Sequence, residues 1–261
     1  MKTPSPRRRH PLAPLAVILL ALVATGGAWA ALGPTERAEA SRVYSEASVE
    51  NGRELFLSNC STCHGLNAEG TTDGPSLIGV GAAAVDFQVG TGRMPLATAS
   101  QQAAEGEVVF TDEQIRDMAA YVATLGPGPF IPTEEMLDTT GADVTRGGEL
   151  FRVNCSMCHN YAGAGGALTE GKYAPKLYDA EDVHIYEAML TGPQSMPVFA
   201  DSQISVEDKQ SIIAYINAVE SEATPGIRLA QLGPVIDGLI TWTVGLGAMV
   251  ACAVWLAVKS K

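Results

Sequence analysis

The sequence predicts an all-α protein made of two tandem copies of one small domain, with an apolar helix near each end of the chain. Three observations lead to this prediction: an internal repeat, apolar residues at helical spacing in each copy, and two long uncharged segments. A chain of 261 residues, 46% of them hydrophobic, is long enough for two domains of ordinary size.

The first uncharged segment runs from Pro11 to Gly33 and follows three arginines at 7–9. Its 23 residues are enough to cross a hydrocarbon layer of about 30 Å. The alternative is a signal peptide cleaved after the small-x-small site at 28–30, although signal h-regions usually have only about 7 to 15 residues. We therefore predict that residues 1–33 form a transmembrane anchor, with a signal sequence as the alternative.

The second uncharged segment, from Gly238 to Val258, has 21 residues and is followed by Lys259 and Lys261. It predicts a transmembrane helix over 236–258. Positive charge outside both segments places both termini in the cytoplasm, if the first segment is retained, and the region between them on the extracytoplasmic face of the cell membrane. Cys252, inside this helix, is interpreted as a small packing residue.

The region between the apolar segments is acidic. It holds all 29 acidic residues but only 11 of the 17 basic ones, a formal charge of −18. This charge argues against a nucleic-acid partner.

The internal repeat aligns NGRELFLSNCSTCHG with RGGELFRVNCSMCHN at a constant offset of 95 residues. It predicts two domains, 41–126 and 141–223, joined by a linker over 127–140 that is rich in proline, glycine and polar residues. In the first copy Ile115, Met118 and Val122 recur at helical spacing, and no long alternating pattern predicts a strand.

Each copy contains the pattern C-x-x-C-H, which is the attachment signature of a c-type haem. The residues are Cys60, Cys63 and His64 in the first copy, and Cys155, Cys158 and His159 in the second. Two thiols at this spacing reach the two vinyl groups of one haem, and the histidine that follows is placed to bind the iron. The sequence therefore predicts two covalently attached haem c groups per chain.

Three alternatives explain the pattern less well. Paired C-x-x-C zinc sites are usually separated by about 15 to 20 residues, whereas 91 residues lie between Cys63 and Cys155. A thioredoxin-like dithiol is expected near a βαβ pattern, and the sequence shows none. Structural disulfides would give no reason for a histidine at the same place in both copies.

A methionine is the predicted second iron ligand in each domain. His64 is the only histidine between residues 34 and 158, which excludes a second histidine ligand from that domain. The repeat pairs Met94 with Met196, each followed by proline, and we predict these as axial ligands. His184 is the rival in the second copy, but its repeat partner is Ala84, so we interpret it as an exposed helix residue.

These residues resemble class I cytochrome c domains. In that family a glycine and an aromatic residue of the first helix pack against an aromatic residue of the last, and Gly52, Phe56 and Tyr121 match those positions. The resemblance also implies that the carbonyls of Pro75 and Pro175 accept the ring N–H of the haem-binding histidines.

The whole arrangement resembles the dihaem cytochrome cc subunit of the actinobacterial cytochrome bcc menaquinol reductase. The resemblance covers nearly the full chain and includes GPSLIGVGAAAVDFQVGTGRMP and GGALTEGKYAPKL. It implies a cytochrome b subunit and a Rieske iron–sulfur protein as partners. It also implies electron transfer to a haem–copper terminal oxidase in the same supercomplex.

Two other functions stay open at this stage. One is a haem enzyme with an open iron site, and the other is a dihaem cytochrome subunit of a different membrane oxidase or dehydrogenase. The 13 residues between Leu96 and Phe110 have no counterpart in the second copy. We interpret them as a tolerated surface insertion, with contact to a partner as the alternative.

Overall fold

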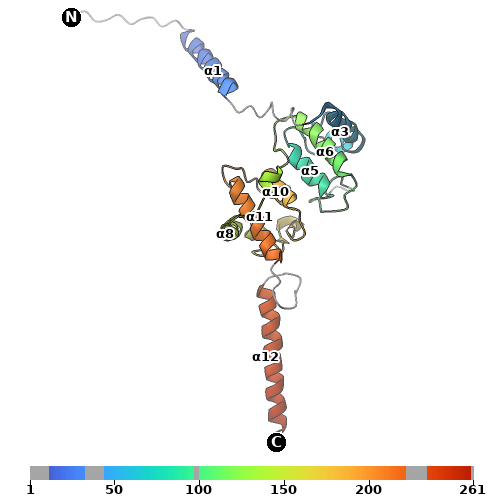
Figure 1. The fold of residues 1–261 in the computed structure, drawn as a ribbon, viewed down its shortest axis with the longest axis vertical. Coiled ribbons are helices and arrows are strands. Elements are labelled where there is room, and N and C mark those ends of the chain that lie inside the picture. The colour runs from blue at the N-terminus through green and yellow to red at the C-terminus, as the bar shows by residue number, and fades with distance from the viewer. Residues whose placement is uncertain (1–11, 33–43, 97–99, 222–233, 260–261) are drawn as a thin grey trace, which may run out of the picture. The chain divides into compact units, whose positions relative to one another are not determined.

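The computed structural model of the protein describes residues 12–32, 44–96, 100–221 and 234–259. Figure 1 shows that almost all regular structure in these residues is helical, which confirms the predicted all-α class. The contacts divide the chain into two units, residues 1–43 and 44–261. The second unit contains both repeat domains.

The first repeat domain has four helices among its described residues. They are α3 (Glu46–Asn59), α4 (Ser61–His64), α5 (Ala82–Gly90) and α6 (Asp112–Thr124). Polar residues fix where the two longest begin. The Ser45 side chain accepts a hydrogen bond from the Ser48 amide at the start of α3, and Thr111 forms a capping box with Gln114 at the start of α6.

The second repeat domain has the same order of helices with a small addition. Its elements are α7 (Glu134–Leu137), α8 (Val144–Asn154), α9 (Ser156–His159), β1 (Gly166–Ala167), η1 (Thr169–Gly171), β2 (Tyr173–Ala174), α10 (Asp182–Thr191) and α11 (Val206–Ser221). The two strands pair antiparallel. They are two residues long, too short for the alternation that marks a strand in a sequence. Met136 and Leu137 of α7, within the predicted linker, pack against the core of this domain.

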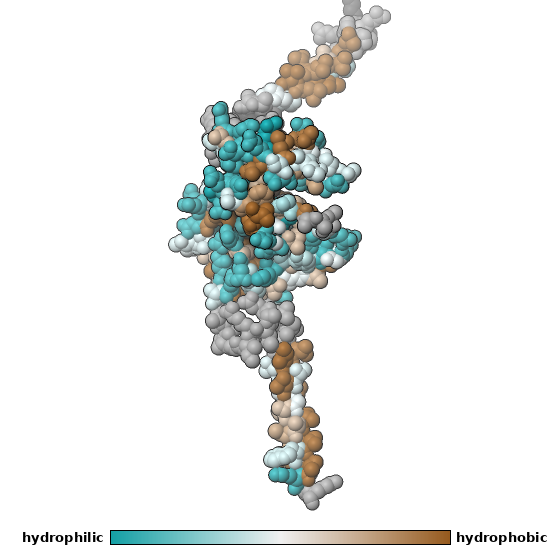
Figure 2. Space-filling view, turned by 90° about the vertical axis from the view of Figure 1, so that its right-hand side faces the viewer, coloured by the Kyte–Doolittle hydropathy of each residue, from teal (hydrophilic) through white to brown (hydrophobic). Residues whose placement is uncertain are grey.

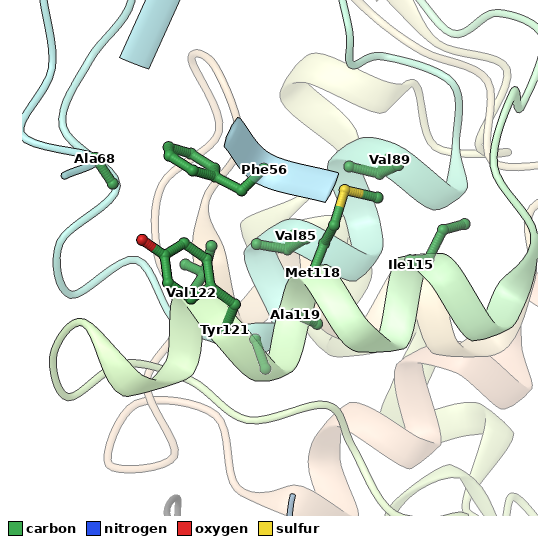
Figure 3. Packing of buried hydrophobic residues seen from close by; sticks show 10 residues of the cluster. Phe56, Ala68, Val85, Val89, Ile115, Met118, Ala119, Tyr121 and Val122 are labelled. Carbon is green, nitrogen blue, oxygen red and sulfur yellow. The ribbon is translucent and has the colours of Figure 1, made fainter. Parts of the chain in front are cut away.

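The two long helices of the first domain cross very closely at Gly52. A methyl group at this position would lie 1.9 Å from the backbone oxygen of Asp117 on α6, so only glycine fits. The close crossing brings the rings of Phe56 and Tyr121 to a centroid distance of 5.3 Å at 44°. Figure 3 shows this pair with other residues of the same cluster, among them Val85 of α5 and Met118 and Val122 of α6.

The second domain repeats this crossing between α8 and α11. A methyl group at Gly147 would lie 1.8 Å from the backbone oxygen of Ser211. Phe151 and Tyr215 stack at 5.4 Å and 44°. The two copies therefore share a packing geometry as well as a sequence pattern.

The segment that only the first copy has, 97–109, contacts the second domain. The Gln102 side chain donates to the backbone carbonyl of Tyr173 and accepts from its amide, both at 2.8 Å. The amide of Ala103, which is 4% exposed, lies 3.3 Å from the Gln194 side-chain oxygen. Our interpretation of this segment as a tolerated surface insertion is therefore wrong, because its described part connects the two domains.

Replacing Gln102 with alanine is expected to free the Tyr173 amide. The two hydrogen bonds together stabilise this contact by about 1–2 kcal/mol, so hydrogen exchange of that amide should become roughly tenfold faster. Gln101→Ala is the matched control, since the Gln101 side chain is exposed. Equal exchange at Tyr173 in both variants would show that the contact does not order this part of the second domain.

A long apolar helix, α12 (Pro234–Lys259), ends the chain. Residues 238–259 are long and apolar enough to cross a membrane, and none of that stretch is buried in the structure. Figure 2 shows apolar surface along much of this helix. In the other unit, α1 (Ala13–Leu32) is also apolar, and its stretch Pro14–Gly27 counts as an apolar helix shorter than a full span.

Candidate functional site

Each C-x-x-C-H motif begins where the first long helix of its domain ends. The Cys60 amide donates to the Phe56 carbonyl at 2.8 Å and closes α3. One further helical turn, α4, then carries Cys63 and His64, and the His64 amide bonds to the Cys60 carbonyl at 3.0 Å. Because the motif follows a rigid helix and is itself helical, both thiols and the imidazole are held in one local arrangement.

The second domain reproduces this arrangement. The Cys155 amide donates to the Phe151 carbonyl at 2.8 Å, and the His159 amide donates to the Cys155 carbonyl at 2.9 Å. Among the described residues, no disulfide joins the cysteines of either motif.

The proline carbonyls predicted to orient the histidines do contact them. His64 Nδ1 lies 2.7 Å from the Pro75 oxygen, and His159 Nδ1 lies 3.0 Å from the Pro175 oxygen. A carbonyl oxygen can only accept, so Nδ1 carries a proton, and in a neutral ring the free lone pair is then on Nε2. This tautomer is the one that binds a metal through Nε2.

The pKa of the first cysteine in each motif argues against a redox-active dithiol. Burial, with a smaller effect of the neighbouring cysteine, raises the pKa of Cys60 and of Cys155 to about 11. A reactive dithiol needs a lowered pKa instead. Burial lowers the pKa of His159, against the opposing effect of the Pro175 hydrogen bond, so this imidazole is neutral and able to act as a ligand.

The methionines differ in burial. Met118 and Met189 are each 2% exposed and belong to the cores, while Met157 is 92% exposed. Met94 and Met196, the predicted ligands, are partly buried at the margins of the two cores.

The second domain contains a cavity of about 680 Å³ that brings its candidate residues together. Its wall includes Cys155, Cys158, His159, Pro175 and Met196. Apolar side chains from the core complete it, among them Phe151, Ile212 and Ile216. A large flat apolar group with covalent and metal attachment points fits this combination.

Comparison with known proteins supports the same conclusion. Residues 49–126 match the cytochrome c family model, and residues 142–216 match the model for subunit III of cbb3-type cytochrome c oxidase. The cytochrome bc1 complex cytochrome c subunit of Mycobacterium leprae (strain TN) is 43% identical over 251 residues, covering 94% of this chain and 87% of the relative.

Two further relatives with the same description agree. That of Mycobacterium tuberculosis (strain ATCC 25618 / H37Rv) is 43% identical over 261 residues, covering 97% of this chain and 93% of its own. That of Corynebacterium efficiens is 41% identical over 268 residues, covering 97% and 90%. The chain belongs to the family of cytochrome bc1 complex cytochrome c subunits.

Membership in this family confirms the two cytochrome c domains and implies two haem c groups per chain. The residues present fit that cofactor in both domains, because the thiol pair, the oriented imidazole and the methionine recur with the same local geometry. In the second domain the cavity supplies the apolar enclosure as well.

Arg93 was not predicted from the sequence as a residue that lines the cavity of the second domain. Arg93 of the first domain lines the cavity, is 9% exposed, and lies 4.8 Å above the Phe87 ring. It pairs with Glu105 at 3.7 Å. Its position next to Met94 was a signal, because the second copy has Ser195 at the matching place.

His184 is the other difference from the sequence analysis. It is half-buried rather than exposed, and its ring meets Phe87 of α5 edge-on at 6.2 Å and 83°. The periodicity of α10 could not show this, because the residues that cover His184 belong to the first domain.

Proposed function

We propose that this cytochrome c subunit is a membrane-anchored electron carrier. It receives electrons from a Rieske iron–sulfur protein and passes them to a haem–copper terminal oxidase. It does so within a menaquinol–cytochrome c reductase that also contains a cytochrome b subunit. The observation that carries the proposal is the twice-repeated site, with the His64–Pro75 contact in one domain and the His159–Pro175 contact in the other.

The residues of each domain have separate tasks. Cys60 and Cys63 would hold the first haem through thioether bonds, and Cys155 and Cys158 the second. His64 and His159 would bind iron through Nε2, while their Nδ1–H groups donate to Pro75 and Pro175 and fix the ring planes.

Met94 and Met196 would close the opposite faces through their sulfur atoms. When bound, haem c supplies an iron that gains and gives up one electron. If His64 with Met94, and His159 with Met196, held the two irons, a substrate would find no free place on either metal, which would favour electron transfer over oxygen or peroxide chemistry. A histidine and methionine pair also favours a high potential, as the accepting side of a quinol-oxidising complex requires.

The apolar helices set the location in this proposal. Helix α12 would anchor the chain in the cell membrane with Lys259 on the cytoplasmic side, and both cytochrome domains would lie on the extracytoplasmic face. An anchored carrier works between fixed partners and does not depend on long-range diffusion.

Replacing Cys155 and Cys158 together with serine is expected to halve the covalently bound haem, from two groups per chain to one. The thiols removed are those that line the cavity of the second domain. A pyridine haemochrome spectrum measured against protein concentration gives the number. Cys252→Ser, in α12, is the matched control and should retain two haems. One covalently bound haem in the parent protein would contradict the proposed attachment.

The role itself is tested by purification of the full chain from its native membrane in mild detergent. Recovery with a cytochrome b subunit, a Rieske protein and a haem–copper oxidase is the expected result. Recovery with a different oxidase or dehydrogenase, and without cytochrome b, would contradict it.

A further inference from the structure

Three side chains meet where α5 of the first domain packs against α10 of the second. They are Asp86 of α5 and His184 and Glu187 of α10, and one ligand atom from each lies within 4.8 Å of the other two. His184 and Glu187 are three residues apart and so share one face of α10. None of the three belongs to the C-x-x-C-H motifs or to the methionine pair.

Glu187 is the unusual member of this cluster. Its residue is 0% exposed, and neither carboxylate oxygen has a hydrogen-bond donor among the described residues. Its close neighbour Asp86 also carries a carboxyl group, and two ionised carboxylates can only accept hydrogen bonds. Buried charges are costly unless they are paired, so the two groups need a proton or a cation between them.

Among the described residues, Glu187 can hydrogen-bond to the Asp86 carboxyl group, and such a bond between two carboxyl groups needs a proton on one of them. Burial first, and then the charge of Asp86, raises the pKa of Glu187 to about 10 when no cation is present. The facing groups on other elements are Tyr44, whose own pKa is raised by burial and by both carboxylates, and Asp112 and Arg116 of α6, whose charges act on Asp86.

We propose that Asp86, His184 and Glu187 form a divalent-metal site between the two cytochrome domains, and that zinc is the ion it fits. Two carboxylates neutralise the charge of Zn²⁺, which removes the cost of burying them unpaired. One imidazole among oxygen ligands favours zinc over calcium or magnesium, which take oxygen ligands. Water would complete a tetrahedral set of four.

The geometry is close to what zinc requires. Bonds of about 2.0–2.2 Å place the ligand atoms of a tetrahedral site roughly 3.4 Å apart, so ligand atoms that lie up to 4.8 Å apart would have to approach by up to about 1.4 Å. The His184 ring is already held in place, edge-on to Phe87 on one side and against Gly90 on the other. A methyl group at Gly90 would lie 3.0 Å from His184 Nε2, so the glycine leaves room for the imidazole.

Such a site would join the domains through a metal. One ligand comes from the first domain and two from the second, so the bound ion fixes α5 against α10. The same contact adjoins the cavity of the second domain, since Phe87, Gly90 and His184 also line it. Zinc would therefore hold the two cytochrome domains at a constant separation.

The test uses the full-length holoprotein with both haems attached. The protein is treated with a chelator, loaded with Zn²⁺ alone and dialysed, and its zinc and iron are measured by inductively coupled plasma mass spectrometry. One zinc per two irons is expected, with only nitrogen and oxygen ligands in X-ray absorption at the zinc edge. No retained zinc, or sulfur ligands, would overturn the proposal.

Two variants locate the site. Glu187→Gln keeps the size of the side chain and the neutral form, and His184→Gln removes the imidazole at the less buried edge of the cluster. Each substitution should weaken zinc binding at least tenfold. The iron-to-chain ratio should stay unchanged, and this ratio reports correct folding independently of zinc. Glu181→Gln, an exposed carboxylate at the start of α10, is the matched control and should bind as the parent does. Equal binding by all four proteins would overturn the assignment and leave a proton-sharing carboxyl pair.

Discussion

Replacing Met196 with alanine is expected to lower the reduction potential of the second haem by on the order of 0.1 V, a part of the roughly 0.8 V range that axial ligands cover. The proposed cause is loss of the thioether sulfur, which stabilises the reduced iron more than water does. The vacated position should also bind added cyanide. Redox titration followed by visible spectroscopy measures the potential, and a cyanide titration counts the open irons.

Met157→Ala is the matched control for this prediction. The residue lies in the same domain, between the two cysteines, but its side chain is 92% exposed and points away from the core. Its removal should change neither potential nor cyanide binding. Met94→Ala should produce the same pair of effects on the first haem only, which assigns each potential to its domain. A Met196→Ala protein that still excludes cyanide would show that another side chain is the sixth ligand.

Replacing Gly147 with alanine is expected to destabilise the second domain by at least about 3 kcal/mol, the upper end of what overpacking usually costs. The added methyl group would lie 1.8 Å from the backbone oxygen of Ser211, and backbone cannot rotate away as a side chain can. Helices α8 and α11 would have to separate, together with the Phe151–Tyr215 pair. For a domain of this size the melting temperature should fall by more than about 10 °C.

Gly247→Ala, in α12, is the control for that substitution. It makes the same chemical change inside a helix, but nothing lies within 4 Å of the added atom. It should leave the melting temperature of the cytochrome domains unchanged. A melting temperature of Gly147→Ala within about 2 °C of the parent would mean that the free energy of unfolding changes by less than ~1 kcal/mol. In that case α8 and α11 would not approach each other as closely as the structure shows.

The repeat explains why so much of each domain could be predicted from the sequence. Gly52 and Gly147, or Phe56 and Phe151, occupy equivalent places because each domain must solve the same packing problem around the same cofactor. Contacts inside a repeat leave a signal at a fixed offset. The contacts of Pro75 with His64 and of Pro175 with His159 were expected from the resemblance to class I cytochrome c domains, and both occur in the structure.

The contacts between the two domains leave no such signal. Gln102 lies in a segment without a repeat partner, so we interpreted it as part of a surface insertion. His184 pairs with Ala84 in the repeat, so we interpreted it as an exposed residue. Both interpretations were wrong. Arg93 likewise lies in one copy only. Gln102 and His184 contact residues about 70 to 100 positions away, and Arg93 lines a cavity made largely by the second domain. Periodicity in a single sequence shows which face of a helix is buried, but not which distant element covers that face.

The first domain contributes to the wall of the cavity in the second domain, and this has a consequence for biosynthesis. Phe87 and Arg93, which form part of that wall, are synthesised well before Cys155 leaves the ribosome. If the chain folds from its N-terminus, the first domain is therefore folded before the second domain is complete. A fragment that starts at α7 would contain Cys155, Cys158 and His159. It would lack the residues of the first domain, such as Phe87 and Arg93, that form one side of the cavity.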